Sequence, residues 1–182
     1  IKIEATNYNN LSSNFSIDKE LLLIEKPICS IIPTGWSSSK TVKCTYPKGY
    51  TNEYSLDNGL TWNVYEKEIS FNNYGTLIAR TSDGVNYQSS SSYTVTGIDR
   101  TAPETVNLTY STTPNSITVT ASAIDQESGI YGYQFSKDGG NTWTDIQTSS
   151  NYIFKSLKAG DYNIRVNAVN GTYINDGLNS TN

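Results

Sequence analysis

The chain has 182 residues, of which 36% are hydrophobic, 12% aromatic and 16% charged, with a formal net charge of −4. This acidic balance without a basic block argues against a nucleic-acid partner held by its phosphates, and we expect none. The absence of histidine excludes a Ser-His-Asp or Cys-His nucleophile system. No segment approaches the roughly 20 apolar residues of a spanning helix, so we expect no direct membrane span. Because there is no methionine, we expect a processed or excised piece of a longer protein.

Short segments bounded by Gly, Pro, Asn, Asp or Ser predict β-strands along the whole chain. The stretches SITVTASA (116–123) and DYNIRVNAV (161–169) alternate with period two, and no stretch sustains the 3.6-residue period of a helix. The pattern predicts an all-β protein without a helix longer than two turns. In chain order the expected strands are 1–7, 21–32, 41–46, 52–56, 61–65, 68–71, 76–82, 91–98, 104–110, 116–123, 131–136, 142–147, 151–154, 161–169 and 172–175.

The clearest boundary is SSSSYTVTGIDRTAPETV, which passes from a strand through a polar turn to Pro103. We predict two β-sandwiches placed end to end, over 20–99 and 100–178. Residues 1–19 are expected to be a connector or the tail of a preceding domain, and 179–182 a tail. The short linker favours a stiff rod with Ile98 buried at the junction.

One phrase, S-x-D-x-G-x-T-W, occurs twice, and its tryptophans lie 81 residues apart (143 − 62). It resembles the Asp box found in the propeller blades of sialidases. The alternative interpretation is a self-closing hairpin turn, in which glycine supplies φ > 0 and the carboxylate accepts hydrogen bonds from turn amides. The residues of the two copies are Ser55, Asp57, Gly59, Thr61 and Trp62, and Ser136, Asp138, Gly140, Thr142 and Trp143.

The hairpin interpretation is favoured by the spacing of the two copies. A propeller requires several blades of about 40–45 residues. Arg80 and Arg165 occupy matching strand positions in the two repeats, so they are not expected to converge on one substrate carboxylate. We therefore expect structural turns, no catalytic residue and no enzyme.

The wider context resembles two families of extracellular modules. PTGWSSSKTVKCTY, YSLDNGLTWNVY, GTLIARTSDGVN and YTVTGIDRTAP are similar to the bacterial immunoglobulin-like repeats of surface proteins. AIDQESGIYGYQFSKDGGNTW and LKAGDYNIRVNAVNG resemble a fibronectin type III module. These resemblances imply a non-catalytic extracellular or cell-surface module that serves as a stiff spacer or in adhesion.

Two alternatives to that function stay open: an immunoglobulin-like protein of a phage fibre or capsid surface, and a carbohydrate-binding module attached to an enzyme. The expected partners are other domains of the parent protein, neighbouring subunits of a filament or surface layer, or a host glycan or protein. No cofactor is expected.

Three further groups of residues are candidates for a site or a staple. Cys29 and Cys44 lie on neighbouring predicted strands and form either a disulfide or two separate buried thiols. Asp99, Asp125 and Glu127 form either a calcium site at the domain junction or a solvated turn. The third group is an aromatic surface for a sugar ring or, alternatively, core and hairpin packing; its members are Trp36, Tyr46, Tyr50, Tyr65 and Tyr74.

Overall fold

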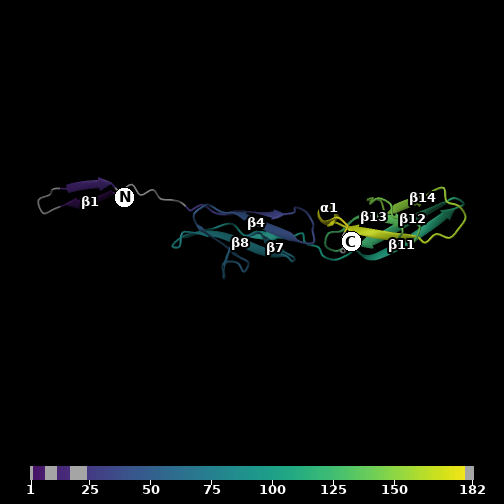
Figure 1. The fold of residues 1–182 in the computed structure, drawn as a ribbon, viewed down its shortest axis with the longest axis horizontal. Coiled ribbons are helices and arrows are strands. Elements are labelled where there is room, and N and C mark those ends of the chain that lie inside the picture. Colours follow the sequence, from purple (N-terminus) through teal and green to yellow (C-terminus); the bar gives the residue numbers. More distant parts are fainter. Residues whose placement is uncertain (1, 7–11, 17–23, 179–182) are drawn as a thin grey trace.

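The computed structural model describes residues 2–6, 12–16 and 24–178 of the chain. These residues form two β-sandwiches that follow one another end to end, with a separate two-stranded hairpin at the far N-terminal side (Figure 1). The expected all-β architecture of two tandem sandwiches is confirmed. Within the described ranges, no helix is long and apolar enough to cross a membrane.

The first sandwich packs a three-stranded sheet against a larger one. The three-stranded sheet has the order β3 (Ile28–Ile32), β4 (Lys40–Thr45), β7 (Ile69–Phe71). The larger sheet has the order β10 (Tyr93–Val95), β8 (Gly75–Ser82), β5 (Thr51–Ser55), β6 (Asn63–Val64), and β9 (Tyr87–Ser89) also pairs with β8. Every pairing is antiparallel, and alternate residues of β8 are buried, as a half-buried strand requires.

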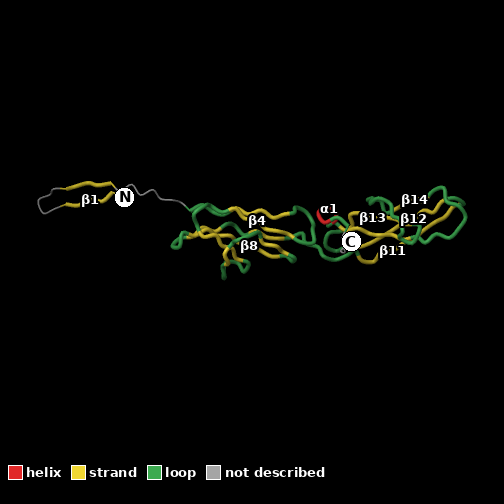
Figure 2. The backbone as a smooth tube through the Cα atoms, viewed as in Figure 1, coloured by secondary structure: helices red, strands yellow, loops and turns green. Residues whose placement is uncertain are grey.

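The second sandwich repeats much of this strand order. One sheet contains β11 (Glu104–Thr113), β12 (Ser116–Ile124) and β14 (Asn151–Phe154). The other contains β13 (Ile130–Ser136) and β15 (Arg165–Asn170). The short helix α1 (Tyr173–Asp176) follows and lies between the two sandwiches (Figure 2).

The hairpin at the N-terminal side consists of β1 (Lys2–Thr6) and β2 (Ser12–Ser16), paired antiparallel from Lys2–Ser16 to Thr6–Ser12. In the described ranges it has no third strand. A hairpin of two strands alone is marginally stable in water, so it needs a further strand or face to be firmly held.

Each sandwich has its own hydrophobic core, as the sequence pattern predicts. Cys29, Val42, Cys44, Leu77, Ala79, Val95 and Ile98 are the buried apolar residues of the first. Those of the second are Val119, Ala121, Tyr133, Phe135, Phe154 and Ala168. Ile98 is buried at the end of the first core, as expected for the junction.

Several strand predictions are wrong in detail. The segment 172–175 was expected to be a strand but belongs to α1, because Asn175 and Asp176 donate their amide hydrogens to Thr172 O. The segment 142–147 contains no strand, although Gln147 forms a bridge with Tyr133 and the Thr144 amide donates to Phe135 O. The first strand of sandwich one begins at Ile28 rather than at 21, and the positions 21–23 lie outside the described residues.

Candidate functional site at the domain junction

The two Asp-box phrases close on themselves as turns. In the first, Asp57 Oδ1 accepts hydrogen bonds from the Ser55 hydroxyl at 2.7 Å and the Thr61 amide at 2.8 Å, and Asp57 Oδ2 accepts one from the Thr61 hydroxyl at 2.5 Å. Gly59 has φ 89° and donates its amide hydrogen to Ser55 Oγ. Trp62 Nε1 donates to Gly59 O, so the indole covers the turn.

The second turn repeats this geometry in the other sandwich. Asp138 accepts hydrogen bonds from the Ser136 hydroxyl at 2.8 Å and from the amide and hydroxyl of Thr142 at 2.9 and 2.6 Å. Gly140 has φ 95°, and Trp143 lies against its backbone. All hydrogen bonds of both carboxylates are local, so each Asp is positioned to hold its own hairpin.

These local hydrogen bonds also lower the carboxyl pKa values. The side-chain and backbone bonds from Thr61, and then the Ser55 hydroxyl, lower the pKa of Asp57 from 3.8 to about 2. Thr142 and Ser136 lower the pKa of Asp138 in the same way, also to about 2. Both side chains are therefore ionised at neutral pH. A carboxylate in this form accepts the hydrogen bonds that the amides and hydroxyls of the turn donate.

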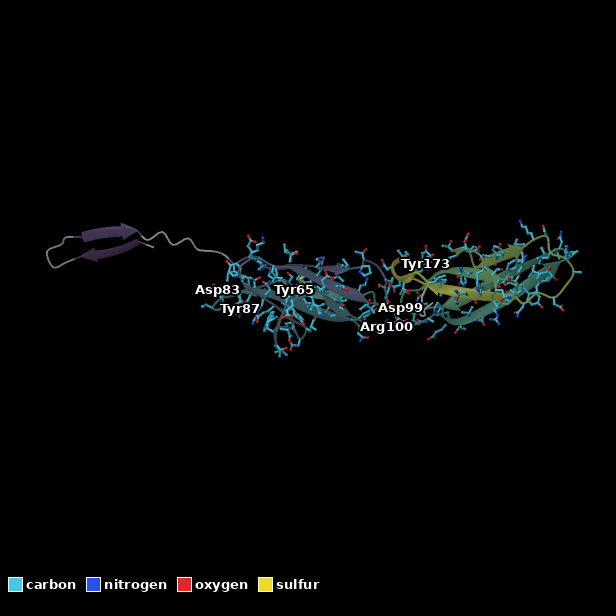
Figure 3. All side chains as sticks on the ribbon, viewed as in Figure 1. Tyr65, Asp83, Tyr87, Asp99, Arg100 and Tyr173 are labelled. Atoms are coloured by element: carbon cyan, nitrogen blue, oxygen red, sulfur yellow. A yellow bond between two sulfur atoms is a disulfide. The ribbon has the colours of Figure 1, made fainter. Side chains whose placement is uncertain are left out.

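Arg80 belongs to the surface of the first sandwich. Its guanidinium lies 4.0 Å from the centre of the Trp62 ring, and its Nε donates to Glu53 Oε2 at 2.6 Å. The Tyr87 ring lies 5.4 Å away on the same surface (Figure 3). The Arg80 guanidinium thus forms an ion pair and cation–π contacts with residues of its own domain.

The two cysteines form a disulfide between β3 and β4, where Cys29 and Cys44 are directly opposite residues. Both are buried in the first core. The Cys29 amide donates to the Tyr93 hydroxyl and the Cys44 amide to the Tyr65 hydroxyl, each at 2.9 Å. The staple therefore sits where the two sheets of the sandwich meet.

The five candidate aromatic residues are separated by the fold. Tyr46 and Tyr65 pack against the first core with ring centres 4.9 Å apart, and burial raises the pKa of the Tyr46 hydroxyl, which donates to Glu53 O. Tyr50 is half-buried in the loop before β5. The five side chains therefore do not form one exposed platform.

Trp36 and Tyr74 instead line a groove of about 530 Å³ on the first sandwich, beside the junction. Tyr74 is exposed and Trp36 is half-buried. Lys40 also lines this groove, but it is 3% exposed and its ammonium donates to Pro33 O at 2.7 Å and to Gly35 O. Burial lowers the pKa of Lys40, and the charge of Asp176 opposes that effect.

The linker is anchored to both sandwiches. Ser37 and Ile98 form a parallel bridge, in which Ser37 donates to Gly97 O and Asp99 donates to Ser37 O. The Asp99 carboxylate is buried and points the other way, toward the second sandwich. It accepts hydrogen bonds from Thr101 N at 2.9 Å, and its Oδ2 accepts from the hydroxyl of Ser128 and, at 3.2 Å, from Asn170 Nδ2.

Asp99 lies close to the other two candidate metal ligands. One carboxylate oxygen each from Asp99, Asp125 and Glu127 lies within 4.8 Å of the others. Asp125 Oδ1 accepts from the amides of Ser128 and Gly129, while its Oδ2 is buried with no hydrogen-bond partner. These three residues form the group in the described chain that could hold a cation. Both Asp99 oxygens already accept hydrogen bonds, so Asp99 is held in place by protein donors. The calcium site stays a prediction.

The helix α1 provides a second attachment between the sandwiches. Asp176 accepts hydrogen bonds from the Ser37 hydroxyl at 2.7 Å and the Ser38 amide at 2.5 Å. Asn175 donates its side-chain amide to Thr34 O at 2.8 Å and to Trp36 O at 2.7 Å. Residues at the C-terminal end of one sandwich are thus bonded to a loop of the other.

The helix is held against its own sandwich from the opposite side. The Thr172 hydroxyl is buried and donates to Asn170 Oδ1 at 2.7 Å. The Tyr173 ring lies 5.0 Å from the Tyr131 ring. Figure 3 labels Tyr173, Asp99 and Arg100 in the region where the two sandwiches meet. We use the name junction clamp for two sets of contacts: those that the linker makes at Ser37 and Asp99, and those that α1 makes with the first sandwich.

The sequence analysis predicted the linker but missed the α1 half of the clamp. Its residues read Thr-Tyr-Ile-Asn-Asp-Gly, which has the β-branched and aromatic composition of a strand. The one signal in the sequence was Gly177, because glycine often follows the last residue of a helix.

Comparison with known proteins adds a structural likeness. No protein-family model matches the chain, and no curated protein sequence matches it. Among solved structures, the chain is similar to a two-domain fibronectin type III segment of chicken tenascin, with 17% sequence identity over 79% of this chain and 90% of that chain, at a TM-score of 0.31. The strand order described above, rather than this superposition, defines the two sandwiches.

Proposed function

We propose that this chain is a non-catalytic structural module, a stiff pair of β-sandwiches that acts as a spacer or interaction segment of an extracellular bacterial surface or filament protein. The observation that carries the proposal is the junction clamp. Two connections at different places, the linker at Asp99 and the helix at Asp176, resist bending better than a single covalent linker does.

Three further features support this role. The Asp-box carboxylates, which are the most enzyme-like residues, bond only within their own turns. Arg80 is occupied by Glu53 and Trp62. The Cys29–Cys44 disulfide suits an oxidising, extracellular compartment.

The test of the proposal is the spread of distances between the two sandwiches. Spin labels on Lys43 and Lys158, read by pulsed electron resonance, should give one narrow distance distribution. Asp176→Ala removes two charge-assisted hydrogen bonds, each worth about 1.5–3 kcal/mol, and should broaden the distribution.

The matched control is Asp161→Ala, which removes an exposed carboxylate of the same sandwich that has no hydrogen bond in the described chain. It should leave the distribution narrow. A broad distribution in the unaltered protein would show that the module is not stiff.

The groove lined by Trp36 and Tyr74 favours carbohydrate binding as a second candidate function. Aromatic side chains beside a concave surface are the usual means of stacking on a sugar ring. Binding of the protein to a glycan array, lost in Tyr74→Ala, would support this function. An array without any bound glycan would leave the spacer role as the better proposal.

A further inference from the structure

Two hollows lie on the surface at the junction, and Tyr74 lines both of them. The first is the groove of about 530 Å³ that also contains Trp36, and the second has a volume of about 510 Å³. Each has the volume of an ordinary small-molecule site, about 300–1,000 Å³. The Tyr74 side chain is 57% exposed. A ligand longer than one hollow can therefore pass from one to the other across the Tyr74 ring.

The residues that line the second hollow come from both sandwiches and from the linker between them. Asn72, Asn73 and Tyr74 connect β7 to β8 in the first sandwich, and Glu127 lies between β12 and β13 in the second. Arg100 of the linker completes the polar lining, and Figure 3 labels it where the two sandwiches meet. A ligand in this hollow therefore contacts both sandwiches at once.

Several polar side chains in the second hollow are available to a ligand. Asn72, Asn73 and Arg100 are exposed, and their side chains make no hydrogen bond or ion pair in the described chain. The Thr101 hydroxyl donates to Glu127 Oε2 at 2.9 Å, which leaves the other carboxylate oxygen of Glu127 available. A sugar hydroxyl can donate to a carboxylate and accept from an amide or a guanidinium. This set of side chains therefore suits a ligand with several neighbouring hydroxyls.

The charges in the two hollows favour a neutral ligand. In the first, the Lys40 ammonium is already bound to two loop carbonyls and interacts with the charge of Asp176. In the second, Arg100 shares the hollow with the carboxylates of Asp99 and Glu127. Neither hollow offers the unopposed cation that binds a phosphate, a sulfate or a carboxylated sugar most strongly.

The wall of the first hollow is also bonded to both sandwiches. In the 33–36 loop, the first and third carbonyl groups accept hydrogen bonds from Lys40 of the same sandwich. The second and fourth accept hydrogen bonds from Asn175 of α1, and the fourth is that of Trp36. The position of the Trp36 backbone therefore depends on the same junction clamp that aligns the two sandwiches.

We propose that the two hollows form one binding site for a neutral oligosaccharide, which stacks a sugar ring on Tyr74 and reaches Asn73 and Glu127 across the junction. Because this ligand contacts both sandwiches, it binds their aligned arrangement more tightly than any other, and by linkage it stabilises that arrangement. The site rests on carbohydrate binding as the candidate function of the Trp36 groove, and it is independent of the spacer function.

The first experiment titrates the full chain in a calorimeter with neutral tetrasaccharides, namely cellotetraose, chitotetraose, maltotetraose and mannotetraose, and with tetragalacturonic acid as the acidic counterpart. At least one neutral probe should bind with a Kd below about 1 mM and more tightly than the acidic probe. If no probe binds, both the carbohydrate function and this site are overturned. If only the acidic probe binds, the carbohydrate function stands and the neutral site is overturned.

Variants of exposed side chains locate the bound sugar. Asn73→Ala and Glu127→Ala, which lie on different sandwiches, should each weaken binding about two- to tenfold. The matched controls are Asn63→Ala and Asp161→Ala, exposed residues outside both hollows, which should leave the Kd unchanged. Binding that is lost in Tyr74→Ala but unchanged in Glu127→Ala would show that the sugar occupies the first hollow alone. That result would overturn the shared site and leave the carbohydrate function in place.

The last measurement relates binding to the alignment of the sandwiches. In Asp176→Ala, the broadened distance distribution between labels on Lys43 and Lys158 should become narrow again when the bound tetrasaccharide is added. The same substitution should weaken tetrasaccharide binding about fivefold or more, because the coupling is reciprocal. Asp161→Ala should change neither quantity. An unchanged affinity in Asp176→Ala, with a distribution that the sugar does not narrow, would overturn the shared site, whereas the distribution of the unaltered protein without sugar tests the spacer function separately.

Discussion

The residues of this chain that most resemble catalytic groups form hydrogen bonds only with residues close to them in the sequence. Asp57 and Asp138 each accept hydrogen bonds from a Ser two residues before and a Thr four residues after. The carboxylates are ionised because these donors lower their pKa values, and the glycines between them supply positive φ angles. The ionised carboxylates stabilise their own turns. This is the simplest explanation for the occurrence of the S-x-D-x-G-x-T-W motif in both domains.

The depressed pKa values predict how stability depends on pH. The folded pKa of Asp57 is about 2, below its ordinary 3.8, so its contribution is present above pH 4 and is lost as pH falls toward 2. Asp57→Ala should lower the melting temperature at pH 7 by about 4–8 °C, as loss of one local cap does. The difference from the unaltered protein should shrink between pH 4 and pH 2, as followed by thermal melting.

The control for this experiment is Glu66→Ala, since Glu66 is exposed and makes no hydrogen bond or ion pair in the described chain. It should change the melting temperature little at any pH. A melting curve of Asp57→Ala that matches the unaltered protein at pH 7 would contradict the structural role of the turn.

The disulfide is expected to stabilise the first sandwich alone. It closes a loop with a sequence separation of 15 residues, for which chain entropy predicts about 3 kcal/mol. Replacing both Cys29 and Cys44 by Ala should lower the free energy of unfolding of that sandwich by this amount, measured by urea denaturation. The second sandwich has no disulfide in its described residues and should unfold as before, which makes it the internal control.

At the scale of elements, the two sandwiches share a strand order but differ in how a sheet edge is completed. The segment 142–147 forms no strand, yet it covers β13 through paired bonds between Tyr133 and Gln147. The approach is close because Gly132 has no side chain: a Cβ there would lie 2.7 Å from Gln147 O and 2.9 Å from Ile146 Cγ2. A glycine in the middle of a strand here marks close backbone approach.

Gly132→Ala is therefore expected to push the 146–147 segment away from β13. Overpacking of this kind costs about 1–3 kcal/mol of unfolding free energy. Gly160→Ala is the matched control, because a Cβ at Gly160 meets nothing within 4 Å and should have little effect. Urea denaturation of the two variants measures the difference, and equal stability would contradict the close approach.

At the scale of the whole molecule, its shape depends on a small number of bonds at the junction. Asp99 connects the linker to Ser128 and Asn170 of the second sandwich, and Asp176 connects α1 back to Ser37 and Ser38 of the first. Most of these bonds join residues far apart in the sequence. They turn two independent cores into one elongated body, as seen in Figure 1.

Asp99→Ala should weaken both the second sandwich and the alignment of the two. Because Asp99 is 1% exposed, the change leaves the half-buried hydroxyl of Ser128 and the buried side-chain amide of Asn170 without this acceptor, at a cost of about 1–3 kcal/mol. Solution scattering should show a broader range of shapes than for the unaltered protein. Scattering and stability that both match the unaltered protein would show that the α1 contacts alone hold the junction.

Local features of this protein follow from its amino-acid sequence alone. Alternation in 116–123 predicts the strand β12, and the Asp-box spacing predicts the two hairpin turns, because a strand face and a tight turn depend on residues within a few positions of one another. The burial of Ile98 follows from an equally local signal, and the domain boundary near Pro103 stays a prediction.

Features that depend on contacts between distant residues could not be predicted from sequence and follow from the three-dimensional fold. The segment 172–175 has strand-like composition, but it becomes helical where Asn175 and Asp176 meet the 34–38 loop of the other sandwich. Sequence reasoning left the pairing of Cys29 with Cys44 open, and the register of β3 on β4 places them opposite one another.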